Sequence, residues 1–167
     1  MNDTIVWKRQ DDSVAITYCA PGVDPEKHRD ELIARAKADA EAAAAGHIHV
    51  PEGHELASAD YLAHEPVAIN PPIPPRCEFR NAMVWDGKNV VHHMGRAREL
   101  RREQLRRERA PVLDALDREF NKAVGMKNSK TVDAIEAKRQ RLRDITKHPD
   151  IDGAETLDAL RAVKLPV

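Results

Sequence analysis

The fold is decided by residues 80–125, which read RNAMVWDGKNVVHHMGRARELRREQLRRERAPVLDALDREFNKAVG. Apolar and polar side chains alternate up to Trp85, and the next dipeptide, Asp86-Gly87, is preferred in two-residue turns of β-hairpins. Residues 89–94 then return as a second strand. The stretch therefore predicts a β-hairpin that leads directly into a long, charged segment of helical sequence.

Two helices are expected after this hairpin. Residues 96–109 have strong helix propensity but very little apolar face, and Pro111 must then either start a new helix or kink a long one. Apolar residues recur at steps of three and four on both sides of a short joint at residues 125–130, after which Thr131 is placed to act as an N-cap. So short a joint predicts that the two helices pack antiparallel as a helical hairpin. Seven apolar positions are expected to hold it together: Leu113, Leu116, Phe120, Val132, Ile135, Leu142 and Ile145.

The N-terminal part predicts a smaller β unit with one helix. Residues 4–8 and 14–19 are rich in β-branched and aromatic residues and flank a polar turn, as the strands of a hairpin do. A helix is expected between Asp24, an N-cap residue, and Gly46, with Pro25 at its first position. This helix should lie on the hairpin.

A proline-rich segment divides the chain. Residues 70–75, Asn-Pro-Pro-Ile-Pro-Pro, hold four prolines, which favour an extended backbone and predict a stiff spacer. We therefore predict an α+β protein in three parts. These are an N-terminal hairpin and helix over residues 1–69, a linker over residues 70–77, and a β-hairpin with a helical hairpin over residues 78–167.

Composition limits the classes of function. The 27 basic and 28 acidic residues nearly cancel, so no global charge attracts nucleic acid or an anionic membrane. Only 4% of residues are aromatic, which predicts a thin core and leaves room for stabilisation by partners or self-association. No apolar run approaches the length of a membrane span and no signal peptide is evident. Cys19 and Cys77 are expected to be structural thiols, with a disulfide as the alternative outside the cell.

The arginine-rich run has three interpretations. Seven arginines and three glutamates lie between Arg96 and Arg109, and helical spacing lets Glu99 reach Arg102 and lets Glu103 reach Arg106 or Arg107. A solvated, salt-bridged helix is the first interpretation, a face for an acidic protein partner the second, and DNA binding the third. The candidates for partner binding are four arginines and two large apolar anchors: Arg101, Arg102, Arg106, Arg107, Trp7 and Trp85.

The sequence contains no recognisable catalytic or cofactor site. It has neither a glycine-rich phosphate loop nor a nucleophile elbow. His47 and His49 would share one face of a short strand at residues 47–50, with His54 nearby, and two such histidines can bind a metal. Surface or hydrogen-bonded histidines are the expected outcome, so no metal site is predicted. The chain is not expected to be an enzyme.

Four segments carry a resemblance to known proteins. They are Phe79-Arg80-Asn81-Ala82 before the second hairpin, residues 93–99 (HMGRARE), residues 109–117 (RAPVLDALD) and residues 138–146 (KRQRLRDIT). As a set they resemble segments of proteobacterial phage and prophage tail proteins. The last one is also similar to the C-terminal segment of tail-fibre assembly chaperones. Those chaperones end in a tryptophan-proline segment, whereas this chain ends Lys164-Leu165-Pro166-Val167.

The resemblance covers roughly half of the chain, from Phe79 onward. It implies a non-catalytic structural protein of the virion, at the tail tip, baseplate or fibre attachment, made in the host bacterial cytoplasm. The implied partners are other tail or fibre proteins, with a homo-oligomer as a further option, and no cofactor is implied. A tail-fibre assembly chaperone is the first alternative, and a nucleic-acid-binding protein that uses the arginine-rich helix is the second.

Overall fold

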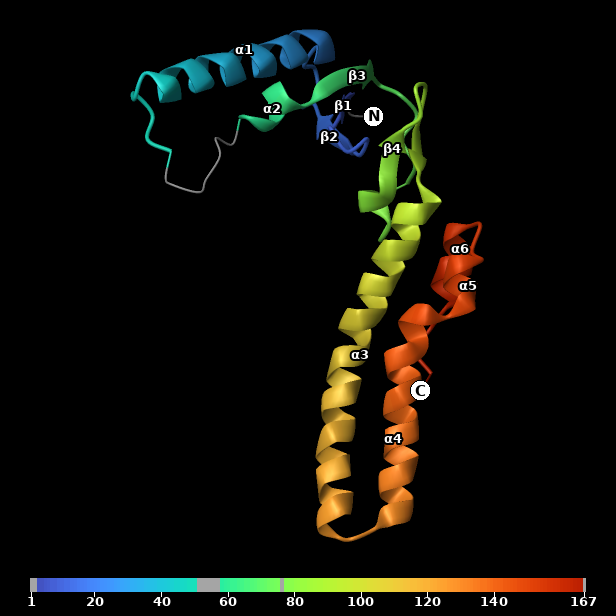
Figure 1. Ribbon diagram of the computed structural model, residues 1–167. Coiled ribbons are helices and arrows are strands. Elements are labelled where there is room, and N and C mark those ends of the chain that lie inside the picture. The colour runs from blue at the N-terminus through green and yellow to red at the C-terminus, as the bar shows by residue number, and fades with distance from the viewer. Residues whose placement is uncertain (1–2, 51–57, 76, 167) are drawn as a thin grey trace. The chain divides into compact units, whose positions relative to one another are not determined.

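The computed structural model describes residues 3–50, 58–75 and 77–166. The protein has an α+β fold, in which two small antiparallel sheets precede a helical C-terminal region (Figure 1). Contacts within the chain divide it into two compact units, Met1–His92 and His93–Val167. The α+β class predicted from the sequence is confirmed, and the division of the chain differs from the one predicted.

Unit 1 is built on a three-stranded antiparallel sheet with the order β2-β1-β3. Strands β1 (Thr4–Lys8) and β2 (Val14–Tyr18) form the predicted hairpin, with Val6 opposite Ile16. Strand β3 (Glu65–Ile69) pairs with the other side of β1 and was not predicted. It contains Pro66, which lacks an amide donor and is tolerated because β3 is an edge strand.

Helix α1 (Pro25–Ala44) begins as the sequence predicts. The Asp24 carboxylate accepts hydrogen bonds from the amides of Glu26 at 2.9 Å and Lys27 at 3.4 Å, which satisfies donors that the first turn leaves open. The helix contacts the short helix α2 (Asp60–Ala63) and strands β1 and β3. Its apolar side chains cover a cluster centred on the sheet: Ile5, Trp7, Cys19, Leu32 and Ile33.

The second sheet consists of β4 (Met83–Trp85) and β5 (Val90–His92), preceded by a turn of 3₁₀ helix at Arg80–Ala82. Its strands are joined by four residues, not by the two-residue turn expected from Asp86-Gly87. The Asp86 carboxylate accepts from the amides of Lys88 at 2.8 Å and Asn89 at 2.7 Å, so this side chain organises the loop. The same bonds hold the pKa of Asp86 below its usual value.

The second hairpin belongs to unit 1, and the proline-rich segment does not act as a spacer between two units. Val6 of β1, Met83 and Val90 form one buried cluster, and Ile73 of the proline-rich segment packs against it. Asn70, in the left-handed region with φ of 51°, accepts from the Thr4 amide at 2.7 Å and ties the start of that segment to β1. The hairpin is too small to bury its own apolar face, so it covers that face with the first sheet.

Unit 2 is the predicted antiparallel helical hairpin with a short helical tail. Figure 1 shows α3 (Met94–Gly125, yellow to orange) beside α4 (Ser129–Asp144, orange). Asn128, not Thr131, caps α4, because its side chain accepts from the Thr131 amide at 3.1 Å. A 3₁₀ turn (Ile145–Lys147), α5 (Pro149–Asp152) and α6 (Leu157–Ala162) follow. The apolar seam between the two long helices consists of Val112, Leu113, Leu116, Phe120, Ala123, Val132, Ile135 and Leu142.

Pro111 lies inside α3, which continues through it without a break. Proline has no amide, so the Arg107 carbonyl receives no helical hydrogen bond from it. Both residues are exposed, which allows water to satisfy that carbonyl. Of the two predicted alternatives, the restart of a new helix at Pro111 is wrong, because one long helix contains the proline.

Replacing Pro111 by Ala should stabilise the protein. The substitution restores the hydrogen bond and removes the ring clash, which together cost about 3 kcal/mol in a helix interior. The unfolded chain becomes more flexible without the proline, and this offsets about 1 kcal/mol of the stabilisation. We expect the free energy of urea unfolding to rise by about 1–2 kcal/mol. The neighbouring exposed change Ala110→Gly should lower it by about 1 kcal/mol. Equal or lower stability of Pro111→Ala would show that the helix needs the proline.

Candidate interaction surfaces

The first half of α3 uses its arginines to hold the C-terminal segment of unit 2. Ala97, Arg101 and Leu105, spaced four residues apart, are all buried along one side of the helix. One Arg101 amino group donates to the Val163 carbonyl at 2.6 Å, and the other donates to the Glu108 carboxylate at 2.9 Å. The guanidinium group is therefore an internal contact of the fold.

Three more arginines act in the same way. Arg98 donates to the Ala154 carbonyl at 2.9 Å, and Arg109 donates to two carbonyls in the last turn of α4, at 3.0 and 2.7 Å. Arg102 donates to the Thr146 carbonyl at 3.2 Å and also pairs with Asp152 at 2.5 Å. Carbonyls at helix ends lack partners within their helix, and these side chains supply donors to them as well as to the Ala154 carbonyl in the loop after α5. We call the four residues the arginine row: Arg98, Arg101, Arg102 and Arg109.

The arginine row changes the interpretation of the predicted partner-binding candidates. Arg101 and Arg102 are occupied within unit 2, and Arg102 also forms the predicted pair with Glu99. Arg106 and Arg107 are exposed, and Arg107 lies 3.4 Å from Glu103, as the helical spacing predicts. The sequence feature that could have predicted the burial of Arg101 is Leu105, because it lies on the same face of the helix as Ala97 and Arg101 and all three are buried.

A second charged cluster joins α3 to α4 further along the hairpin. Arg139 of α4 pairs with Asp117 of α3 at 2.5 Å and with Glu136 at 2.7 Å, and its guanidinium group lies 4.8 Å from the centre of the Phe120 ring. Arg143 donates to Glu136 at 2.9 Å. Hydrogen bonds from Arg143 and Arg139 lower the pKa of Glu136. Asp117, which stands near other carboxylates in the sequence, is a structural partner of Arg139.

The two tryptophan candidates both belong to the packing of unit 1. Trp7 is 1% exposed, donates to the Thr17 hydroxyl at 3.0 Å and meets Tyr61 edge-on at a ring separation of 5.3 Å. Trp85 is half-buried and packs on the cluster that contains Val6. Trp7 is thus a core anchor, and only Trp85 retains accessible surface.

The histidine candidates do not share a strand. Gly46 has φ of 76° and residues 47–50 form bends and irregular chain, so the alternation that would align His47 with His49 is absent. Both side chains are exposed, and His54 lies outside the described residues. Within the described ranges, no group of three or more His, Cys, Asp or Glu side chains is arranged to hold a metal ion.

The other histidines and the cysteines have local roles. The Cys77 sulfur lies 3.5 Å from Nε2 of His92, while His93 caps α3 by accepting from the Arg96 amide at 3.2 Å. Both cysteines are free thiols. Cys19 is buried in the first core cluster, and burial raises the pKa of its thiol.

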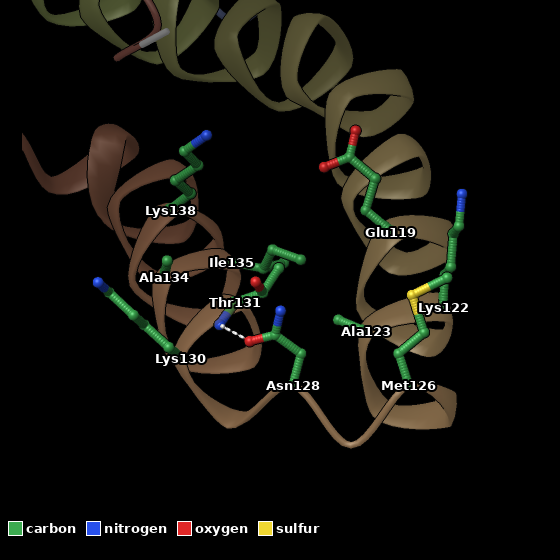
Figure 2. A pocket seen from close by; sticks show the side chains of 10 residues that line it. All are labelled: Glu119, Lys122, Ala123, Met126, Asn128, Lys130, Thr131, Ala134, Ile135 and Lys138. Carbon is green, nitrogen blue, oxygen red and sulfur yellow. Dashed lines mark hydrogen bonds between the residues drawn. The ribbon is translucent and has the colours of Figure 1, made fainter.

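A groove opens where the α3–α4 hairpin turns. It has a volume of about 510 Å³, and Figure 2 shows Glu119, Ala123 and Ile135 turned toward the space between the two helices. Its other lining side chains include three lysines and an exposed methionine: Lys122, Lys130, Lys138 and Met126. The floor is apolar, and three lysines outnumber the one glutamate among the charged lining residues, so the groove is a candidate surface for a partner that carries carboxylates.

A second groove, of about 540 Å³, lies beside the C-terminal end of α4. Basic side chains predominate there as well, although Asp144 and the exposed face of the 3₁₀ turn also contribute. Its lining residues are Arg141, Asp144, Ile145, Lys147, His148, Pro149, Lys164 and Pro166.

Comparison with known proteins gives no relative. The chain matches no protein-family model, and no curated protein or solved structure matches it. Over the described residues, no helix is both long and apolar enough to cross a membrane. The function must therefore be argued from the chain itself.

Removing the Arg101 side chain should strongly destabilise the protein. Arg101→Ala leaves the Val163 carbonyl without its donor in a buried setting and removes the partner of Glu108, so we expect a loss of about 2–4 kcal/mol in urea unfolding. The matched change Arg106→Ala, at an exposed position one turn away, should alter stability by no more than about 0.5 kcal/mol. Similar effects of the two changes would contradict a structural role for the arginine row.

The ion pairs of Glu136 should make stability depend on pH in the acid range. Because the folded-state pKa lies below the ordinary value of 4.5, the stabilisation is present above that value and is lost as pH falls through the folded pKa. A double-mutant cycle of Glu136→Gln and Arg143→Gln should show favourable coupling at neutral pH that vanishes in acid. Coupling that does not change with pH would exclude an ionic origin.

Proposed function

We propose that this chain is a non-catalytic structural component of a phage tail, acting through protein–protein contacts at the tail tip, baseplate or fibre attachment. The supporting observation is the position of the segments that carry the resemblance. Residues 93–99 form the start of α3, residues 109–117 run through Pro111, and residues 138–146 form the end of α4. All three segments thus form one continuous scaffold, with the groove at its turn available to a partner.

A tail-fibre assembly chaperone is the second candidate. Residues 138–146 resemble chaperone sequence. Within them, the Arg139 side chain pairs with Asp117, Leu142 packs between α3 and α4, and the Arg143 carbonyl accepts from Arg109. These contacts within the hairpin explain the segment without a partner, so the segment does not favour the chaperone over the tail component. Binding of nucleic acid through the arginine-rich helix is less favoured, because Arg101 and Arg102 already contact carbonyls and carboxylates of unit 2.

Quantitative mass spectrometry of gradient-purified particles of the encoding phage tests this proposal. We expect the chain to remain with the particles at a few copies each, measured against a major tail protein, because a tail component binds its neighbours permanently. A small unrelated protein of the same lysate serves as the control for trapped material. Abundance in the lysate with absence from the particles would overturn the proposal in favour of the chaperone.

A further inference from the structure

The free end of the helical hairpin carries a basic surface with exposed apolar side chains. We define the hairpin tip as residues 119–138, which contain four lysines and three carboxylates, and its central residues 120–132 contain three lysines and no carboxylate. Met126 is 66% exposed and Val124 is 50% exposed. Apolar side chains surrounded by like charge favour a partner that presents carboxylates around an apolar residue.

The acidic segment, residues 149–162, has the complementary character. It contains four carboxylates and one arginine. The side chains of Asp150 and Asp158 are 71% and 87% exposed, and Asp158 also pairs with Arg161 at 2.6 Å, so the segment keeps a net negative charge that faces solvent. Leu157, half-buried, lies in the sequence between Glu155 and Asp158. An accessible leucine flanked by carboxylates matches an apolar groove that is rimmed by lysines.

The acidic segment cannot reach the tip of its own hairpin. Contacts from Arg98 to Ala154 and from Arg102 to Asp152 fix it beside the first half of α3. A rise of about 1.5 Å per residue places Gly125 about 35 Å from Arg102 along the same helix. The two complementary surfaces therefore lie at opposite ends of unit 2, and a contact between them requires two molecules.

We propose that the hairpin tip of one molecule binds the acidic segment of a second copy. The contact is head-to-tail, so each molecule uses one surface to bind and offers the other, and repetition gives a ring or an open chain. A symmetric contact between two tips would bring lysines together and is disfavoured by charge. This self-association goes beyond the proposed function and does not depend on it.

Sedimentation velocity of the purified full chain tests the proposal. The average mass should rise with protein concentration at low salt and fall back toward the monomer at high salt, where exposed charges are screened. The tip variant, Lys130→Glu with Lys138→Glu, should weaken association by about tenfold or more, because carboxylates would then face carboxylates. The matched control, Arg106→Glu with Arg118→Glu, makes the same change in net charge at exposed positions of α3 outside the tip and should associate as the wild type does.

Charge exchange supplies the sharper test. The segment variant, Glu155→Lys with Asp158→Lys, should also associate about tenfold more weakly by itself. An equimolar mixture of the tip and segment variants should associate again, since opposite charges then meet at each contact. Circular dichroism checks that each variant is folded. If the segment variant is unfolded, the single change Glu155→Lys, in the loop before α6, takes its place.

Three results would overturn the proposal. They are a wild type that stays monomeric at low salt, a tip variant that associates like its control, and a mixture that remains monomeric. A monomeric wild type that sediments with phosphatidylglycerol vesicles would assign the tip to an anionic membrane surface instead.

Discussion

Unit 2 depends on arginine side chains that donate hydrogen bonds to carbonyls at helix ends and in the loop between α5 and α6. Helices α5 and α6 span only four and six residues, and helices of that length are not stable by themselves. They are fixed in place because Arg98 and Arg101 reach the Ala154 and Val163 carbonyls, while Ile151 and Leu160 are fully buried. Polar and apolar contacts with these short helices are thus both made by the first half of α3.

The thin cores explain why polar contacts carry so much of the structure. The sequence offers two phenylalanines and two tryptophans, and only Trp7 and Phe79 are fully buried. Small apolar clusters remain, and each requires a neighbouring element to close it: α1 over the first sheet, the second hairpin against β1, and α4 along α3. Arg139, placed over the Phe120 ring and between two carboxylates, has the same function at the seam of the helical hairpin.

The sequence predicts those features that local chemistry determines and misses those that depend on distant partners. The cap at Asp24, the first hairpin and the helical hairpin follow from spacing and residue type. Strand β3 was missed because a five-residue segment with Pro66 acquires strand character only by pairing with β1. The place of the second hairpin in unit 1 rests on the contact of Met83 with Val6, and the burial of Arg101 rests on Val163, 62 residues away. Leu105 marks the face of Arg101 as buried, but no local pattern identifies Val163 or Val6 as the partner.

The cations that fix the C-terminal segment and the cations of the tip differ in kind, although exposed arginines such as Arg106, Arg107 and Arg118 also lie on α3. All four members of the arginine row are arginines, whose planar fork can donate to two acceptors and keeps its charge when buried. The cations of the tip, Lys122, Lys127, Lys130 and Lys138, are all lysines, and all are exposed. Lysine is more strongly hydrated and gains less from burial, so it suits a rim that binds reversibly. Helix α3 can therefore be fixed near its start by buried and half-buried arginines and still present an exposed lysine, Lys122, near its end.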